Sequence, residues 1–254
     1  MVLEWRNSDV AGVRVTHWKK EDAQTIVDSI SSKPLRIVNT ENGPTIHVYA
    51  YGPHELAVRK YGDPARGLDI FYTLKQSVEE KAALTEIPFA KIRHLDGDFS
   101  VVTLWKKRTR MLHEYLRDVT VAMDDKKLMC KRVVKLVAKL HAAGYTHGHI
   151  KGDNVLVQLN KLPVLVDPRL LTKRNQPEGV NPWESRKKDF CWKVNDISVN
   201  FFEYCGQMIH HPRGISRDVS PVKRVEIMND AKIFERDLEQ HYHDHFDKLN
   251  IIRK

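Results

Sequence analysis

The sequence predicts an α+β fold with two lobes, a small antiparallel β lobe carrying one main helix and a mostly helical lobe. Three observations support this. Strand-like stretches separated by Gly and Pro turns fill residues 35–61. The longest helical pattern covers residues 126–143. Two short apolar stretches, 155–157 and 164–166, follow it like the arms of a hairpin.

We therefore expect three regions. A helical extension occupies residues 1–34, the β-rich lobe residues 35–105, and the helical lobe with a charged helical tail residues 106–254. Gly and Pro turns and a basic run separate the regions, and no internal repeat is visible.

Composition limits the classes of protein that fit. The chain has 254 residues, of which 41% are hydrophobic and 30% charged, so it is long enough to bury a sizeable core. Its net charge of +9 favours polyanionic partners such as nucleotides, nucleic acid, anionic lipid or acidic protein surfaces, without choosing among them. Three cysteines without C-x-x-C spacing favour a reducing compartment, and no apolar run approaches the ~20 residues that span a bilayer. We expect a soluble, cytoplasmic protein without a transmembrane segment.

The elements of the first two regions follow from local patterns. Residues 21–30 show helical spacing of apolar residues. The stretches LRIVNT, IHVYAYG and PHELAVRKYG predict three strands of an antiparallel meander. Residues 68–84 predict a helix with Ile70, Leu74 and Val78 on its buried side, and FSVVTLW at residues 99–105 predicts a buried strand.

The third region is expected to be mainly helical. The basic run KKRTR, near the expected lobe junction, leads into MLHEYLRD, which predicts a short helix. The long helix at 126–143 has a stripe of apolar residues and ends at Gly144. DISVNFFEY at 196–204 predicts a buried helix, and residues 225–254 predict a charged one. The stripe consists of Leu128, Val133, Leu136, Val137 and Leu140.

The segments THGHIKGDNVLV and VLVDPR carry the strongest functional signal. His147, His149, Lys151 and Asn154 occupy the frame of the H-R-D-L-x-x-x-N catalytic loop, and Asp167 stands where the aspartate of D-F-G would stand. The sequence thus resembles the protein-kinase-like superfamily. Its His-Gly pair is similar to that of compact members such as the Bud32 and RIO kinases, aminoglycoside phosphotransferases and lipopolysaccharide core kinases.

The resemblance implies ATP and Mg²⁺ as cofactors. A carboxylate and an amide on the two ends of one tight hairpin would converge on a Mg²⁺ that bridges nucleotide phosphates, so Asn154 and Asp167 are the expected metal ligands. Asp196, at the start of the predicted central helix, would brace the catalytic loop. The plainer interpretation is a surface hairpin whose Asn and Asp only form turns.

In the β lobe, LAVRKYG resembles the strand whose lysine contacts the α- and β-phosphates. Arg59 and Lys60 lie on opposite faces of that strand and compete for the role, and we slightly favour Lys60 because a compact ammonium suits two phosphates and a glutamate. Glu80 is the first candidate for the pairing glutamate and Glu79 the second. The segment ENGPTIHVYAYG lacks G-x-G-x-x-G, which predicts weak or unusual nucleotide binding.

Activity depends on the residue that replaces the catalytic aspartate. His149 stands in that place, so it is a candidate base, with His147 and Asp153 as alternatives. Lys151 completes the expected catalytic group. One hypothesis is an atypical kinase that transfers the γ-phosphoryl group to a protein or small-molecule hydroxyl. The other is a pseudokinase, a binding or regulatory scaffold for a protein partner.

Two further sequence patterns give weaker functional signals. The tryptophans near the basic runs are too irregularly spaced for base stacking, which argues against a nucleic-acid partner. His241 and His245 lie one helical turn apart, a spacing that can bind zinc, but no third ligand is evident and we interpret them as a solvated helix face.

Overall fold

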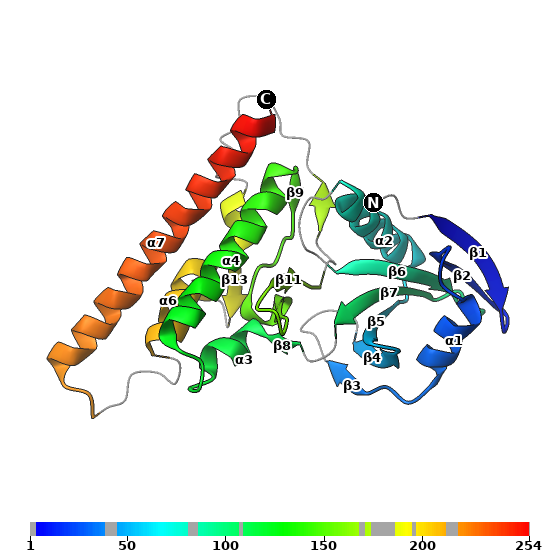
Figure 1. Ribbon diagram of the computed structural model, residues 1–254, viewed down its shortest axis with the longest axis horizontal. Coiled ribbons are helices and arrows are strands. Elements are labelled where there is room, and N and C mark those ends of the chain that lie inside the picture. The colour runs from blue at the N-terminus through cyan, green and yellow to red at the C-terminus, as the bar shows by residue number, and fades with distance from the viewer. Residues whose placement is uncertain are drawn as a thin grey trace. The chain divides into compact units, whose positions relative to one another are not determined.

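The computed structural model describes residues 4–38, 45–80, 86–106, 109–167, 171–173, 186–194, 197–211 and 218–253. The chain forms two compact units (Figure 1). The first unit contains residues 1–81 and 85–109, and the second contains residues 82–84 and 110–254.

The first unit is built on a seven-stranded antiparallel sheet. Its strand order is β1-β2-β6-β7-β5-β4-β3, and each neighbouring pair is antiparallel. The three strands predicted within residues 35–61 and the buried strand at 99–105 are confirmed. The strands are β1 (Trp5–Val10), β2 (Val13–Trp18), β3 (Arg36–Val38), β4 (Ile46–Tyr51), β5 (His54–Tyr61), β6 (Ile87–Arg93) and β7 (Phe99–Lys106).

The N-terminal residues differ from the helical extension expected over residues 1–34. The helix is present as α1 (Ala23–Ser31), but β1 and β2 precede it as a hairpin. β2 pairs with β6, so the hairpin extends the sheet of the first unit. Its tight turn places Ala11 and Gly12 at positive φ, a local geometry that strand periodicity does not signal.

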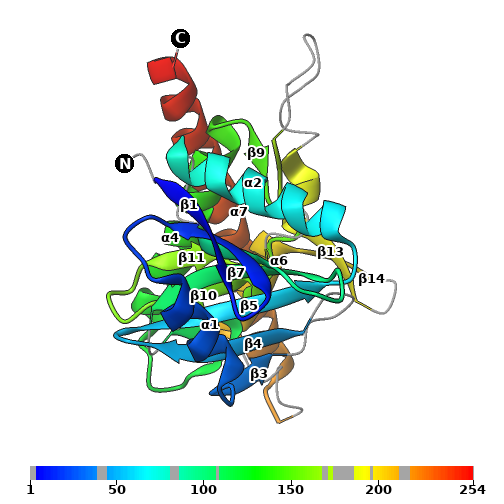
Figure 2. The ribbon, with the colours of Figure 1, turned by 90° about the vertical axis from the view of Figure 1, so that its right-hand side faces the viewer.

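Helices α1 and α2 (Pro64–Glu79) pack on opposite faces of this sheet (Figure 2). Ile26 of α1 belongs to the cluster that contains Val102 of β7, whereas α2 approaches Phe99 of β7 closely at Gly67. Because side chains alternate along a strand, Phe99 and Val102 mark the two faces. α2 begins at Pro64, earlier than expected, since the Asp63 side chain caps it by accepting from the N–H of Ala65.

The second unit surrounds the long helix α4 (Met123–Ala142). α4 packs against α6 (Phe201–His210), α7 (Pro221–Arg253) and β11 (Pro163–Leu165). In Figure 1, α7 runs beside α4. The predicted hairpin is confirmed: β10 (Val155–Val157) pairs with β11, and β8 (Arg110–Met111) pairs with the other edge of β10. The remaining elements are α3 (Leu112–Arg117), β9 (Tyr145–Thr146), η1 (Gly152–Asn154), β12 (Thr172–Lys173), η3 (Lys188–Phe190), β13 (Cys191–Val194) and β14 (Ile197–Asn200).

Two details of the predicted helices are corrected. Leu128 was placed in the apolar stripe of α4 but is 45% exposed, because the buried face follows Met129, Val133 and Val137. The helix predicted at 196–204 begins only at Phe201, where Asn200 caps it by accepting from the N–H of Phe202.

No described helix is both long and apolar enough to cross a membrane.

The close contact of α6 with α7 depends on Gly206. A Cβ at this position would lie 2.6 Å from the carbonyl oxygen of Ala231, a backbone atom that cannot rotate away. We expect Gly206→Ala to lower the free energy of unfolding by about 1–3 kcal/mol, since one helix must shift. Urea denaturation measures this, with Gly62→Ala as the control because a Cβ there meets no heavy atom within 4 Å. Equal stability of the two variants would contradict the packing.

Candidate functional site

The β10–β11 hairpin brings the two expected metal ligands to its same end. The N–H of Val166 donates to the carbonyl oxygen of Asn154 at 2.9 Å, continuing the ladder in which Val155 faces Leu165. Asp167 follows Val166 directly, so it is adjacent to this last rung. Asn154 and Asp167 are 5% and 4% exposed. Asp167 has φ +63°, a left-handed conformation that Asp tolerates better than most residues and that is frequent at functional sites.

The Asn154 side chain is oriented by the loop before it. Its Nδ2 donates to the carbonyl oxygen of His149 at 2.9 Å and lies 3.3 Å from the Nδ1 of the same residue. Because the amide nitrogen faces the loop, Oδ1 is the atom that can bind a cation. An amide oxygen and a carboxylate are the hard oxygen donors that Mg²⁺ prefers, and Mg²⁺ usually takes only one or two protein ligands together with phosphates and water.

This donor set therefore fits Mg²⁺. Within the described ranges there is no group of three or more His, Cys, Asp or Glu residues that could hold a metal ion, so a site made wholly of such side chains is not found there. A two-ligand site whose remaining positions come from substrate oxygens is the type that this hairpin can form.

The loop between β9 and η1 is held by Asp189 of η3. Its carboxylate accepts from the N–H of His147 at 2.8 Å and from the N–H of Gly148. Its carbonyl oxygen accepts from the N–H of Ile150 at 3.1 Å. The carboxylate also accepts from Nε2 of His141 at 2.8 Å. One residue that is 3% exposed thus fixes the loop that orients Asn154.

The brace continues into α7. His141 lies on α4, and its Nδ1 accepts from the hydroxyl of Tyr242 at 2.7 Å. Burial lowers the pKa of His141, so the imidazole is neutral, with its proton on Nε2 facing Asp189. Burial by itself raises the pKa of Asp189, but the hydrogen bond from His141 and the loop N–H groups hold that pKa below its usual value. A buried carboxylate therefore stays ionised and fully bonded.

Steric constraints explain why glycine occupies two positions here, Gly148 in the loop and Gly152 at the start of η1. Gly148 has φ +83°, which a residue with a Cβ adopts only with strain, so the His-Gly pair suits this backbone. At Gly152 a Cβ would lie 2.4 Å from the hydroxyl oxygen of Tyr204, a residue of α6. The backbone at Gly152, the first residue of η1, therefore lies close against the Tyr204 side chain.

Lys151 ends this loop, and Asp153 lies in η1, which follows it. Lys151 is buried, and its Nζ lies 3.7 Å from the carboxylate of Asp153. Nδ1 of His113, on α3, lies 2.7 Å from the carboxylate of Asp153 in an ion pair. The contact with His113 lowers the pKa of Asp153, and the contact with Asp153 raises the pKa of His113. An ionised carboxylate held in this ion pair is a weak base, which disfavours Asp153 as the proton acceptor.

In the first unit the buried cation is Arg59. Its Nη1 donates to Glu86 Oε2 at 2.6 Å and its Nη2 donates to Glu86 Oε1, a bidentate pair whose side chains are 1% and 0% exposed. Thr103 of β7 donates to Glu86 at 2.9 Å. Arg59 and Thr103 share the face of the sheet on which α2 packs.

The other candidates of the first unit lie elsewhere. Lys60 is on the opposite face of β5, about half exposed, and pairs with Asp96 at 3.1 Å and Asp98 at 2.8 Å. Glu80 follows the last residue of α2 and accepts from Gln76, and Glu79 pairs with Lys75. The glutamate brought to the buried cation is Glu86, just before β6.

No family model matches this chain, and no curated protein matches its sequence. Among solved structures, a chain of "WaaP in complex with acyl carrier protein" matches with 15% sequence identity and a TM-score of 0.47. The match covers 82% of this chain and 88% of the other. This similarity does not establish a family.

Sequence reasoning missed Asp189 and Glu86. Asp196, the expected brace, lies outside the described residues, as do Gly43 and the Lys107–Arg108 part of the basic run. The residue observed to brace the loop is Asp189, in the segment KDF. A single acid followed by an aromatic is too common a pattern to find it. Glu86 could have been suggested only by its position beside an apolar strand.

Acid should lower the free energy of unfolding of the second unit, because His141 is buried in its neutral form. Because burial lowers its pKa, unfolded chains take up a proton below about pH 6.5 that the folded unit does not. Stability should therefore fall as the pH falls from 7 to 5, by on the order of 1 kcal/mol per unit of pKa difference. We expect His141→Gln, whose amide can replace both hydrogen bonds, to flatten this dependence in urea denaturation. His54→Gln, in the first unit, is the control, and an unchanged slope in His141→Gln would contradict the assignment.

Proposed function

We propose that this chain is an atypical kinase-like protein that binds ATP with Mg²⁺ and transfers the γ-phosphoryl group to a protein or small-molecule hydroxyl. The observation that supports it best is the 2.9 Å backbone hydrogen bond from Val166 to Asn154, because it holds Asn154 next in space to the residue that precedes Asp167, at one end of a braced hairpin. A surface hairpin with ordinary turn formers needs neither the burial of both side chains nor a buried carboxylate beneath its loop.

Four residues of the second unit have roles in this proposal. Asn154 Oδ1 and the Asp167 carboxylate hold the ion, and Mg²⁺, when bound, neutralises charge that develops on the transferred phosphoryl group. Lys151, the buried last residue of the loop, supplies positive charge for phosphate oxygens. Asp189 keeps the loop backbone in place, so that little reorganisation is needed during transfer.

Arg59 is the candidate phosphate-binding residue of the first unit. A guanidinium can bind a carboxylate with two N–H groups and still present others to phosphate oxygens, which a lysine engaged with Glu86 could do less well. Lys60, about half exposed and paired with two aspartates, is the weaker candidate. We therefore transfer the proposed phosphate contact from Lys60 to Arg59, with Glu86 in place of Glu80 as its partner.

The geometry of His149 favours an alternative, a pseudokinase that binds a partner without turnover. The Nδ1 of His149 faces the amide nitrogen of Asn154 at 3.3 Å. An N–H group aimed at Nδ1 favours the tautomer with its proton on Nε2. In that tautomer Nε2 has no lone pair with which to accept a proton from a hydroxyl. Catalysis by His149 would require the imidazole to turn or to exchange tautomers.

Magnesium-dependent nucleotide binding is the first test. We expect a non-hydrolysable ATP analogue to raise the melting temperature only when Mg²⁺ is present. At a hundredfold excess of analogue over Kd, binding should raise the free energy of unfolding by about 2.7 kcal/mol. Asp167→Asn removes the charged ligand with little change of shape and should abolish the shift. The matched control is Asp125→Asn, an exposed aspartate of α4 that pairs with Lys161. A shift that persists in Asp167→Asn would refute the metal assignment.

Turnover decides between the two functions. We expect the wild type to form ADP slowly from ATP with Mg²⁺, and Asp167→Asn to lose this activity. His149→Asp places a carboxylate at the base position and should raise the rate, since a well-placed general base contributes about 10²–10⁴-fold. Quenched assays that separate ADP from ATP measure both. A magnesium-dependent thermal shift without ADP formation in either protein would establish the pseudokinase.

A further inference from the structure

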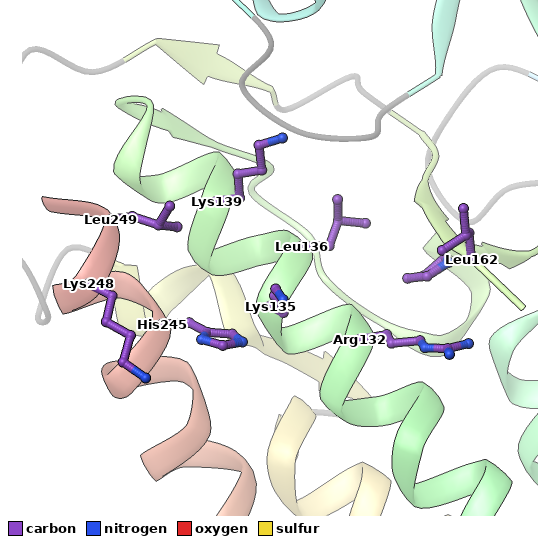
Figure 3. Close-up of a pocket in the computed structure, with 9 residues that line it drawn as sticks. Arg132, Lys135, Leu136, Lys139, Leu162, His245, Lys248 and Leu249 are labelled. Atoms are coloured by element: carbon purple, nitrogen blue, oxygen red, sulfur yellow. The ribbon is translucent and has the colours of Figure 1, made fainter. Parts of the chain in front are cut away.

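A groove of about 540 Å³ lies on the second unit (Figure 3). It includes Leu162 and Pro163 at the turn of the β10–β11 hairpin, the opposite end from Asn154 and Asp167. Its apolar surface and its cations come from three elements: α4, α7 and the turn that precedes β11. The apolar residues are Leu136, Leu162, Pro163 and Leu249, and the basic ones are Arg132, Lys135, Lys139, Lys248 and His245.

The groove has a regular geometry. Arg132, Lys135, Leu136 and Lys139 are spaced i, i+3, i+4 and i+7 and so share one face of α4 over about two turns, roughly 10 Å. α7 forms one wall through its packing on α4. The turn before β11 forms the other, tied to α4 because Arg132 donates to the carbonyl oxygen of Lys161 at 2.6 Å.

The cations of the groove lack acidic partners within the described residues. None of Arg132, Lys135, Lys139 and Lys248 forms an ion pair with a carboxylate in that part of the chain. Burial lowers the pKa of His245, and the positive charges of His241, Lys135 and Lys248 lower it further. The basic residues of α4 and α7 therefore line the same groove.

The floor of the groove is apolar, and the cations beside it have no carboxylate partner among the described residues. Such a surface fits an occupant that is apolar on one side and anionic at its edges. A planar membrane fits poorly, because the floor is recessed between two walls. An added β-strand also fits poorly, because β11 starts with Pro163, which has no N–H to donate. A rod with an apolar stripe fits the trough.

We propose that this groove binds an acidic amphipathic helix of a protein partner. Its apolar residues, at i, i+4 and i+7, contact Leu136, Leu162 and Leu249, and its carboxylates on both flanks pair with the cations of α4 and α7. Apolar contact supplies affinity, while charge supplies rate and orientation. The site is independent of the proposed ATP site, since no residue is shared.

The test uses a labelled peptide of about fifteen residues, long enough for helix formation, with leucines at this spacing and glutamates on both flanks. Fluorescence anisotropy measures its dissociation constant with the full chain. We expect Lys135→Glu with Lys139→Glu to weaken binding more than tenfold and Leu162→Asn to weaken it several-fold. A peptide with glutamine for glutamate should bind more weakly, and added salt should weaken the glutamate peptide.

A matched control reverses two charges elsewhere on α7. Lys232→Glu with Arg236→Glu changes the net charge equally but leaves the groove intact, so binding should be unchanged. Asp167→Asn should also bind normally, which separates failure here from failure of the proposed ATP site. Should the groove variant misfold by circular dichroism, hydrogen exchange of the wild type serves instead, and the peptide should protect residues 132–139.

Three outcomes would overturn the proposal. The first is undiminished peptide binding by the folded Lys135→Glu, Lys139→Glu protein, or no protection of residues 132–139. The second is equal loss of binding in the control reversal, which would show general attraction to a basic protein. The third is no peptide binding together with binding to phosphatidylglycerol vesicles, which would assign the surface to anionic lipid.

Discussion

The second unit depends on the buried carboxylate of Asp189. A charge removed from water is costly unless its bonding capacity is filled, and here His141 and the N–H groups of His147 and Gly148 fill it. The same residue receives the N–H of Ile150 through its carbonyl oxygen. Because these bonds act together, the loop, α4 and η3 form a single connected network, and removal of any member leaves another buried group unsatisfied.

This network connects the Asn154 side chain on one side with helix α7 on the other. Toward the hairpin, a fixed loop backbone presents the carbonyl oxygen of His149 to the Asn154 side chain, whose amide nitrogen donates to it. In the other direction, Tyr242 bonds to His141, so the charged C-terminal helix is part of the support of the site. An amphipathic helix that only covered the core would not need a buried hydroxyl at this position.

The first unit shows the same principle with an ion pair. Arg59 and Glu86 are both buried and bonded at two points, and Thr103 fills a further acceptor site of the carboxylate. Such a pair contributes little net stability over an apolar pair, but loss of one partner is expensive. Because the two charges are buried together, Arg59 and Glu86 fix each other's position in the core of the sheet.

The sequence by itself determined the α+β class, the antiparallel strands of the first unit, the long helix α4 and the hairpin that carries Asn154 and Asp167. These features follow from local periodicity, turn residues and a motif of fixed spacing, all read within a few residues. The tertiary structure decided which charges are buried. Arg59 was separated from Lys60, Glu86 was chosen over Glu80, and Asp189 emerged as the brace of the loop. Pairing across 27 or 42 residues depends on how sheets and helices pack, and local pattern holds no information on which of many similar acids and bases will meet.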